Sequence, residues 1–545
     1  MASHRTLLLL LKACGSIGAS EKGEEIHAYI AKERLLERNL ILSNALMDMY
    51  AKCGDLVKAQ EVFNHIQMRD EISWNTLITG YARHRHSKEV LECHGRMQLE
   101  GFSQNTVSFL ATLKGCGTIE LIKKGMETHA KIVKEEILES NILVGSALVD
   151  MYAKCGAIYR AQEVFDKLVM RNVVSFNVII GAYVEQGHGE EALQHLENMH
   201  CEHISPNATT LTCSLKACGS IGARDRGQKL HSYIITKGLL ESDELLGNSL
   251  VDMYIKTKLL EEAQEVFDRL LIHDVISWTM LITGYSEYGD ESKALHCFQQ
   301  MQEAGISPVE ATFVSGLTAC RNLRAIGKGQ YIHGEAMNKG LEEEVVIGNT
   351  MVSMYAKCGL LGTAKDVFDR LLCRDIVSCN ALMTGYGHLG ESLSVLNIFQ
   401  KMKQEGIEPD ATSFVCIINA YSHGGLLGKG QMYFTIISKY YGFAPTLDHY
   451  NCVVDLIARA GHMYSAMAII KKMPLHPGIM IWHSLLGACR KWGNVALGRY
   501  AFDEAVQLDE GDDAAYLCMF NIYSDADMDD EAKYIERLRV EVMNR

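Results

Sequence analysis

The chain has 545 residues, of which 48% are hydrophobic and only 6 are proline, a composition that permits a large core and favours helix. The formal net charge of -14 argues against a protein that binds nucleic acid through bulk positive charge. No apolar run approaches the roughly 20 residues of a membrane span, so we expect no membrane partner. The 17 cysteines include no CxxC pair, which favours reduced, buried thiols over a disulfide framework.

The first apolar stretch, Leu7 to Leu11, has two interpretations. It resembles the short core of a signal peptide, but its pattern recurs from Phe109 onward, within the chain. We therefore interpret it as the first helix of a repeated unit and expect no processed presequence.

The chain repeats itself every 102 residues. Cysteines keep this spacing, as do histidines, and tyrosines and prolines follow it to within one residue: Cys14, Cys116, Cys218, Cys320; His27, His129, His231, His333; Tyr50, Tyr152, Tyr254, Tyr355; Pro206, Pro308, Pro409. Each period divides into units of about 36, 31 and 35 residues, each with two apolar-periodic stretches and a glycine-containing break. Gly54, Gly156 and Gly359 suit the position after a helix, where positive φ is cheap for glycine.

These features predict an all-α fold, a right-handed α-solenoid of about sixteen stacked two-helix repeats. One hairpin cannot bury its apolar face alone, so neighbouring hairpins must stack. The first helices of successive units then line one extended face.

Three recurring blocks carry a family resemblance. LKACGSIG, VDMYAKCG and SWNTLITGY resemble the L, S and P motifs of PLS-class pentatricopeptide-repeat proteins, the plant organelle RNA-editing type. The resemblance divides the chain into four L-S-P triplets over residues 1–410 and a last L and S unit over 411–478. The tail, 479–545, resembles the helical E1 and E2 motifs through IMIWHSLLGACRKWGN and AAYLCMFNIYSDADMDDEA.

The resemblance implies sequence-specific binding of single-stranded RNA, one repeat per nucleotide, as a site-recognition factor for C-to-U editing in the mitochondrion or chloroplast. The deaminase signature, H-x-E with P-C-x-x-C, is incomplete here: His188–Glu190 and His333–Glu335 match its first half inside repeats. We therefore expect no catalytic residue, metal or cofactor, and no DYW deaminase domain after the E2-like unit. A DYW-type cytidine deaminase and organellar editing accessory factors would act in trans.

The residues expected to bind RNA occupy three positions of each S and P unit, numbered so that the Asn of SWNT is position 5. Position 5 and the last position would read a base edge, because short amides, hydroxyls and carboxylates exchange hydrogen bonds with it. Aliphatic side chains at position 2 of adjacent units would sandwich the base. Position 5 holds Asn44, Asn75, Ser146, Asn177, Asn248, Thr279, Asn349, Asn380 and, in the final S unit, Asn451; the last position holds Asp70, Asn105, Asn172, Asn207, Asp274, Val309, Asp375 and Asp410; position 2 holds Ile41, Ile72, Leu143, Val174, Leu245, Ile276, Val346 and Val377.

Structural alternatives exist for two of these positions. An Asp or Asn before a helix is a good N-cap, worth about 1 kcal/mol, and both roles can coexist. Position 2 could instead form a hydrophobic staple.

By the family's code, Asn with Asp resembles a uridine reader, Asn with Asn a pyrimidine reader and Ser146/Asn172 an adenosine reader. Thr279/Val309 departs from the code and suggests a purine, and Asn451/Gly478 is irregular. Position 5 of the L units is mostly aliphatic, so those nucleotides should be weakly specified: Leu8, Leu110, Thr212, Val314, Val415. The implied target is roughly n-U-Y-n-A-Y-n-U-R-n-U-U-n-Y, and in the family the edited cytidine lies four nucleotides beyond the base read by the last S unit.

Other features have competing interpretations. The Cys and His of the L units could bind zinc or pack between helices, and packing is favoured because two ligands do not close a tetrahedral site. The tyrosines of the S units, Trp74 and Trp278 could stack on bases or fill the core; Phe176 and Cys379 at equivalent positions favour the core. Asp525–Glu531 is either a solvated helix start or a docking surface.

Two other function classes remain open. The acidic charge is compatible with a protein-interaction scaffold, but the repeated Asn/Asp pairs oppose it. RNA stabilisation or splicing is the third option, which the PLS pattern with an E-like tail disfavours.

Overall fold

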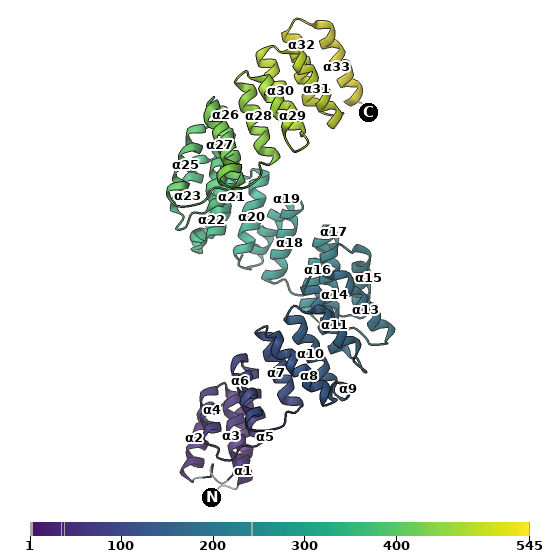
Figure 1. The fold of residues 1–545 in the computed structure, drawn as a ribbon, viewed down its shortest axis with the longest axis vertical. Coiled ribbons are helices and arrows are strands. Elements are labelled where there is room, and N and C mark those ends of the chain that lie inside the picture. The colour runs from purple at the N-terminus through teal and green to yellow at the C-terminus, as the bar shows by residue number, and fades with distance from the viewer. Residues whose placement is uncertain (1–3, 34, 37–38, 241–242, 544–545) are drawn as a thin grey trace. The chain divides into compact units, whose positions relative to one another are not determined.

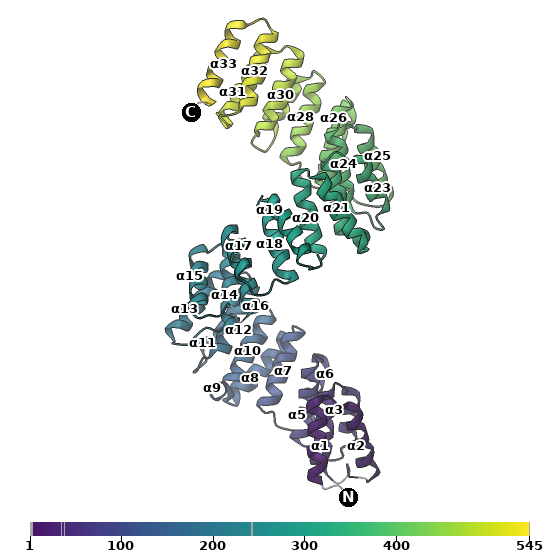
Figure 2. The same ribbon diagram turned by 180° about the vertical axis from the view of Figure 1, so that it is seen from behind.

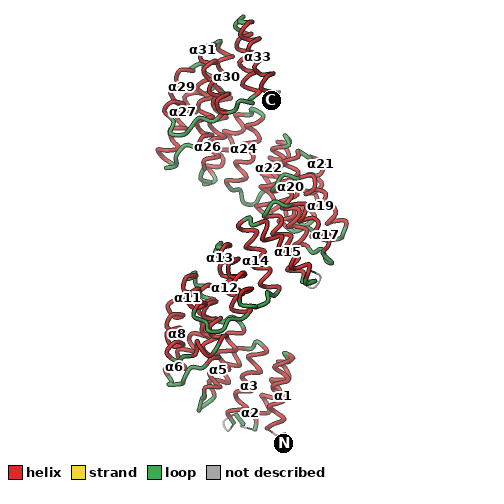
Figure 3. The backbone as a smooth tube through the Cα atoms, turned by 90° about the vertical axis from the view of Figure 1, so that its right-hand side faces the viewer, coloured by secondary structure: helices red, strands yellow, loops and turns green. Residues whose placement is uncertain are grey.

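The computed structural model describes residues 4–33, 35–36, 39–240 and 243–543. The chain divides into two compact units, one ending at His273 and the other beginning at Asp274, and each is considered by itself. Figure 3 shows that the described residues form helices and loops and no strand. The predicted all-α solenoid is therefore confirmed, and the helices pair into sixteen hairpins within the described residues.

The first unit contains eight hairpins, each with a first helix (helix A) and a second helix (helix B). Its A helices are α1 (His4–Ile17), α3 (Leu40–Cys53), α5 (Glu71–Arg83), α7 (Thr106–Thr118), α10 (Ile142–Lys154), α12 (Val173–Glu185), α14 (Ala208–Ile221) and α16 (Glu244–Lys256). Its B helices are α2 (Ser20–Lys32), α4 (Leu56–His65), α6 (Ser87–Leu99), α8 (Ile122–Lys134), α11 (Ile158–Asp166), α13 (Gly189–Cys201), α15 (Arg224–Thr236) and α17 (Leu260–Arg269), with the short α9 (Ile137–Ser140) after α8.

The second unit repeats this plan. Its A helices are α18 (Val275–Glu287), α20 (Glu310–Leu323), α22 (Val345–Lys357), α24 (Ile376–His388), α26 (Ala411–His423), α28 (Leu447–Arg459), α30 (Ile479–Trp492) and α32 (Asp513–Asp525). Its B helices are α19 (Glu291–Glu303), α21 (Ile326–Asn338), α23 (Leu361–Arg370), α25 (Ser392–Gln404), α27 (Leu427–Tyr440), α29 (Met463–Lys472), α31 (Val495–Leu508) and α33 (Asp529–Met543), with the 3-10 helix η1 (Leu341–Glu343) before α22.

Within each unit the A helices form a continuous layer. Each A helix packs against the next A helix and against its own B helix, and most B helices also contact the following A helix (Figure 1). This packing places equivalent positions of successive A helices on one face, as the repeat predicted.

The helix ends follow from local sequence. In α5, α7, α12, α14, α24 and α26, an Asp or Asn caps the helix and a Ser or Thr three residues later returns a hydrogen bond, completing a capping box. After helix A of the S units, Gly54, Gly156 and Gly359 have φ of 90°, 73° and 83°, as predicted. Lys258 holds the same place in the third triplet with φ 62°, a conformation that strains an L side chain.

The core explains the 102-residue register. The S-unit tyrosines are at most 3% exposed, and each hydroxyl lies 2.7–2.9 Å from Nδ1 of the L-unit histidine before it: His27–Tyr50, His129–Tyr152, His231–Tyr254, His333–Tyr355. Trp74, Phe176, Trp278 and Cys379 are buried, as are the register cysteines. The packing interpretation is confirmed for these residues, and base stacking by the tryptophans and tyrosines is wrong.

The two ends of the chain also agree with the sequence analysis. Leu7 and Leu11 are buried in α1, which packs on α3, so this stretch is a repeat helix. Asp529, Asp530 and Glu531 are exposed in the first turn of α33, where negative charge complements the helix dipole.

Over the described residues, no helix combines the length and apolarity needed to cross a membrane, and no three His, Cys, Asp or Glu side chains group as a metal site would require.

Candidate nucleic-acid interface

The residues at the last position of each S and P unit begin the next A helix. All seven Asp and Asn side chains accept a hydrogen bond from the backbone N–H three residues later, at 2.8–3.1 Å: Asp70, Asn105, Asn172, Asn207, Asp274, Asp375 and Asp410. Val309 has no polar side chain for this role, and Thr312 instead bonds to its backbone N–H. The N-cap alternative is therefore realised, and it fixes the position of each carboxylate or amide at the start of its helix.

Four of the predicted pairs meet through a side-chain hydrogen bond. The position-5 amide Nδ2 donates to the oxygen at the last position in Asn44–Asp70 (3.3 Å), Asn177–Asn207 (3.1 Å), Asn349–Asp375 (2.9 Å) and Asn380–Asp410 (3.0 Å). Because the partners come from successive A helices, each pair bridges two repeats. Asn44, Asn349 and Asn380 are less than 10% exposed.

The other pairs differ. Ser146 donates instead to the Ile142 carbonyl at 2.9 Å, and Thr279 bonds Thr312 at 2.7 Å. The Oδ1 atoms of Asn75 and Asn451 are buried without a hydrogen-bond partner among the described residues. The two residues of the predicted pair Asn248/Asp274 belong to different units, so each is considered by itself.

A third residue that the sequence analysis missed completes several pairs. The hydroxyl of the Ser or Thr three residues into the next helix donates to the position-5 Oδ1 in Ser73–Asn44 (2.8 Å), Thr210–Asn177 (2.5 Å) and Ser413–Asn380 (2.7 Å). The signal was available, because a Ser or Thr occurs three residues after every predicted last position from Asp70 to Asp410.

These hydrogen bonds also set the charge of the pair. Burial alone raises the pKa of the Asp70 carboxyl, but the hydrogen bonds from Ser73 and Asn44 outweigh it and leave that pKa below its ordinary value. Asp70 is therefore an anionic acceptor near neutral pH.

Position 2 forms an exposed aliphatic row. Its eight side chains are between 52% and 68% exposed: Ile41, Ile72, Leu143, Val174, Leu245, Ile276, Val346 and Val377. A hydrophobic staple would be buried against its own helix, so the exposure contradicts that alternative. Large aliphatic groups held in solvent at one repeated position indicate a contact surface.

Two P units show how these positions combine. A hollow of about 250 Å³ in the first unit is lined by Ile72, Asn75 and Val107, and one of about 500 Å³ in the second by Val377, Asn380 and Thr412. Val107 and Thr412 are position 2 of the following repeat. Each hollow therefore has position 5 with a position-2 side chain from two adjacent repeats in its lining, the arrangement required for base sandwiching.

Some of the cations beside this face are neutralised internally. In three S units a lysine pairs with an aspartate one turn earlier, at 2.6–2.8 Å: Lys52–Asp48, Lys154–Asp150 and Lys256–Asp252. In the fourth, Ser353 replaces the aspartate near Lys357 and accepts from Arg321 at 3.3 Å. Arg321, Lys357 and Asn380 line the same hollow.

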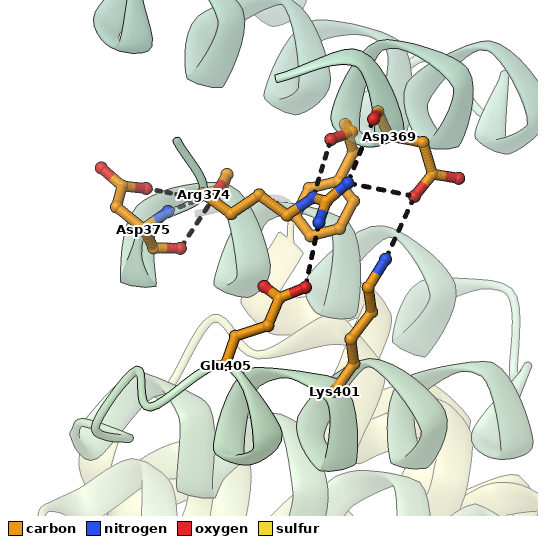
Figure 4. A network of polar contacts seen from close by, with 7 residues as sticks. Asp369, Arg374, Asp375, Lys401 and Glu405 are labelled. Carbon is orange, nitrogen blue, oxygen red and sulfur yellow. Dashed lines mark hydrogen bonds and ion pairs between the residues drawn. The ribbon is translucent and has the colours of Figure 1, made fainter. Parts of the chain in front are cut away.

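An arginine anchors the last position of the S units. Arg374 donates to the Phe368 and Asp369 carbonyls at 3.1 and 3.0 Å, pairs with Glu405 of the P unit at 2.9 Å, and covers the Phe368 ring (Figure 4). Lys401 bonds Asp369 at 3.4 Å beside it. Arg69 and Arg171 make the same contacts with a glutamate of their own P units, whereas His273 substitutes for arginine in the third triplet. The anchor holds the backbone immediately before Asp375.

Comparison with known proteins identifies the family of the repeats. A family model described as PPR repeat matches residues 41–70, 72–102, 146–173, 248–275, 276–306 and 349–376, and one described as PPR repeat family matches 171–220 and 374–423. A putative pentatricopeptide repeat-containing protein of Arabidopsis thaliana is 34% identical over 96% of this chain and 76% of its own length. Two others from Arabidopsis thaliana, named chloroplastic and mitochondrial, are 33% and 32% identical over 95% and 97% of this chain. The chain spans only 64% and 60% of these two relatives.

Solved structures match over the whole chain. The pentatricopeptide repeat protein PPR10 from maize aligns with a TM-score of 0.64 and 17% identity, covering 100% of this chain and 90% of that one. PPR10 in complex with an 18-nt psaJ RNA element aligns with a TM-score of 0.65 and 18% identity, covering 100% and 85%. At this identity the likeness supports the helical-repeat fold.

Proposed function

Because this chain belongs to the pentatricopeptide-repeat family, we propose that it binds single-stranded RNA in a sequence-specific manner, one S or P repeat to one nucleotide. One observation carries the proposal: exposed aliphatic side chains at position 2 flank a position-5 amide already oriented by its N-cap partner. A base entering between two such side chains gains stacking contacts, and its edge then meets the amide and the carboxylate.

The base preferences follow the pairs. Asn44/Asp70, Asn349/Asp375 and Asn380/Asp410 would accept uridine, Asn75/Asn105 and Asn177/Asn207 a pyrimidine, and Ser146/Asn172 adenosine. The buried Oδ1 atoms of Asn75 and Asn349 that lack a partner among the described residues support a ligand at those positions, since buried polar groups are normally hydrogen-bonded.

The proposed cellular role is site recognition for C-to-U editing of an organelle transcript, with a DYW-type cytidine deaminase and accessory factors supplied in trans. The resemblance of the L, S, P and tail motifs supports this role, and the chloroplastic and mitochondrial names of the relatives support an organelle.

Binding of defined RNAs tests the first part. An RNA of the pattern n-U-Y-n-A-Y-n-U-R-n-U-U-n-Y should bind more tightly than its complement. Asn380→Thr should shift preference at the single nucleotide facing that unit from uridine toward a purine, while Asn397→Thr, an exposed position on helix B of the same unit, should not. Indifference to both the RNA sequence and Asn380→Thr would refute base reading at position 5.

Transcript sequencing after gene disruption tests the cellular role. Loss of one C-to-U change in an organelle transcript is expected. Altered transcript ends or retained introns with editing intact would instead indicate a role in RNA stabilisation or splicing.

A further inference from the structure

The first hairpin of the tail repeats the geometry of the base-reading units. Numbered in the same way from Ile479, the unit has Met480 at position 2, His483 at position 5 and Asp512 immediately before the next A helix, α32. His483 Nε2 lies 2.5 Å from Asp512 Oδ2. Asp512 caps α32 by accepting from the Ala515 N–H at 3.4 Å. The tail therefore has a position-5 side chain bonded to an N-cap carboxylate, as in Asn380–Asp410.

The position-2 side chain of this hairpin also matches those of the S and P units. Met480 is 58% exposed, within the 52–68% range of the eight aliphatic position-2 side chains. Figures 1 and 2 show α28, α30 and α32 in succession within the second unit, and α30 contacts both neighbours, so the A-helix layer continues into the tail.

The neighbouring hairpins lack this combination. The final S unit has Asp448 at position 2, and its Asn451 is followed by Gly478 at the last position. The second tail hairpin has Ala514 at position 2 and Leu517 at position 5. The complete set of an exposed apolar side chain, a polar reader and an N-cap carboxylate thus recurs in the first tail hairpin.

We propose that Met480, His483 and Asp512 form a further base-binding position, which takes the nucleotide directly 3′ of the one facing Asn451. The inference rests on the proposed function, because it extends the same one-repeat-per-nucleotide binding into the tail.

The chemistry of the pair defines the class of base. When Nε2–H donates to the Asp512 carboxylate, the neutral imidazole keeps Nδ1 as an acceptor. The pair then offers acceptors, an imidazole nitrogen and carboxylate oxygens, to the edge of the base. Adenine, cytosine and guanine each present an amino donor, whereas uracil presents two carbonyls beside its single N–H. The site should therefore accept any of the amino-bearing bases and disfavour uracil.

The test uses the full chain and RNAs that extend the predicted target by one nucleotide and differ only there. Fluorescence anisotropy should show binding about five- to tenfold weaker with uridine at that nucleotide than with adenosine, cytidine or guanosine, the size expected for a single base contact. His483→Leu should abolish this difference while leaving the discrimination at the nucleotide facing Asn380 unchanged. Met480→Ser should weaken binding of the extended RNAs about threefold or more through lost stacking, and Met432→Ser, at an exposed methionine on helix B α27, should not.

Two results would overturn the inference. One is wild-type protein that is indifferent to the added base while it still discriminates at the nucleotide facing Asn380. The other is a His483→Leu chain that unfolds at lower urea concentration but keeps the discrimination against uridine, which would make His483–Asp512 a structural tie between α30 and α32. Loss of discrimination at every nucleotide would instead refute the proposed function itself.

Discussion

The arginine anchor of the S units offers the sharpest test of how these repeats hold the residue at the last position. In Arg374→Ala the Phe368 and Asp369 carbonyls at the end of α23 lose their donor, Glu405 loses its cation and the Phe368 ring loses its cover. Arg374→His is the milder change, because His273 at the equivalent position still reaches the Phe267 carbonyl at 2.9 Å and stacks on the Phe267 ring.

The magnitudes follow from exposure. The Arg374 side chain is 20% and Glu405 32% exposed, so water and ions screen their pair, which should contribute about 0.5 kcal/mol. The carbonyl bonds contribute about 1 kcal/mol and the cation over the ring about 0.5 kcal/mol more. Arg374→Ala should therefore destabilise the junction by about 2 kcal/mol, and Arg374→His by about half of that.

Local hydrogen exchange measures the effect, because a repeat array opens in segments. Amides of residues 371–376 should exchange faster in Arg374→Ala, while the equivalent segment after Phe63, where Arg69 is intact, serves as an internal control. A double-mutant cycle with Glu405→Gln should give a coupling of about 0.5 kcal/mol. Unchanged exchange at 371–376, or equal losses in Arg374→Ala and Arg374→His, would refute the assignment of Arg374 as the anchor before Asp375.

Further predictions concern stability. Lys258→Gly should stabilise the first unit by about 0.5 kcal/mol, since glycine relieves the positive φ, and Gly156→Lys should cost about 1 kcal/mol, both measured by urea unfolding. Burial lowers the pKa of His94 to about 4, so the protein is most stable above pH 6.5, where His94 is neutral in both the folded and the unfolded state. Stability is lost as the pH falls from 6.5 toward 4, and the loss should reach about 2 kcal/mol at pH 5. His94→Leu should flatten this pH dependence. Tyr152→Phe should cost about 1 kcal/mol by removing the bond to His129, whereas Tyr159→Phe, at a side chain 81% exposed, should be neutral in the same thermal melts.

The fold was accessible from sequence because its signals are local and repeated. The hairpins follow from apolar periodicity, and the positive φ of Gly54 follows from its place after a helix. The burial of Trp74 also followed, because Phe176 and Cys379 at equivalent positions share its apolar character. The division of the chain after His273 has no comparable signal, since the repeat continues through it.

The candidate site was predicted less completely. The repeat register shows which residues occupy positions 2 and 5. The direction of their hydrogen bonds, however, depends on side-chain rotamers and on neighbours in the next repeat. Ser146 therefore turns to the Ile142 carbonyl, whereas Asn380 reaches Asp410, although both occupy position 5. The role of His483 depends on a contact with Asp512, about thirty residues away, which no local pattern specifies.

The internal pairing of the S-unit lysines Lys52, Lys154 and Lys256 has a kinetic consequence. A lysine that already holds an aspartate, as Lys154 holds Asp150, releases few counterions when it meets a phosphate, so it adds little to attraction at a distance. Under the proposed RNA binding, and with a net charge of -14, the chain should leave mismatched transcripts quickly. Residence time on RNA would then be governed by the bases that fit between the aliphatic side chains, and transcripts would be sampled by rapid dissociation rather than by sliding along the phosphate backbone.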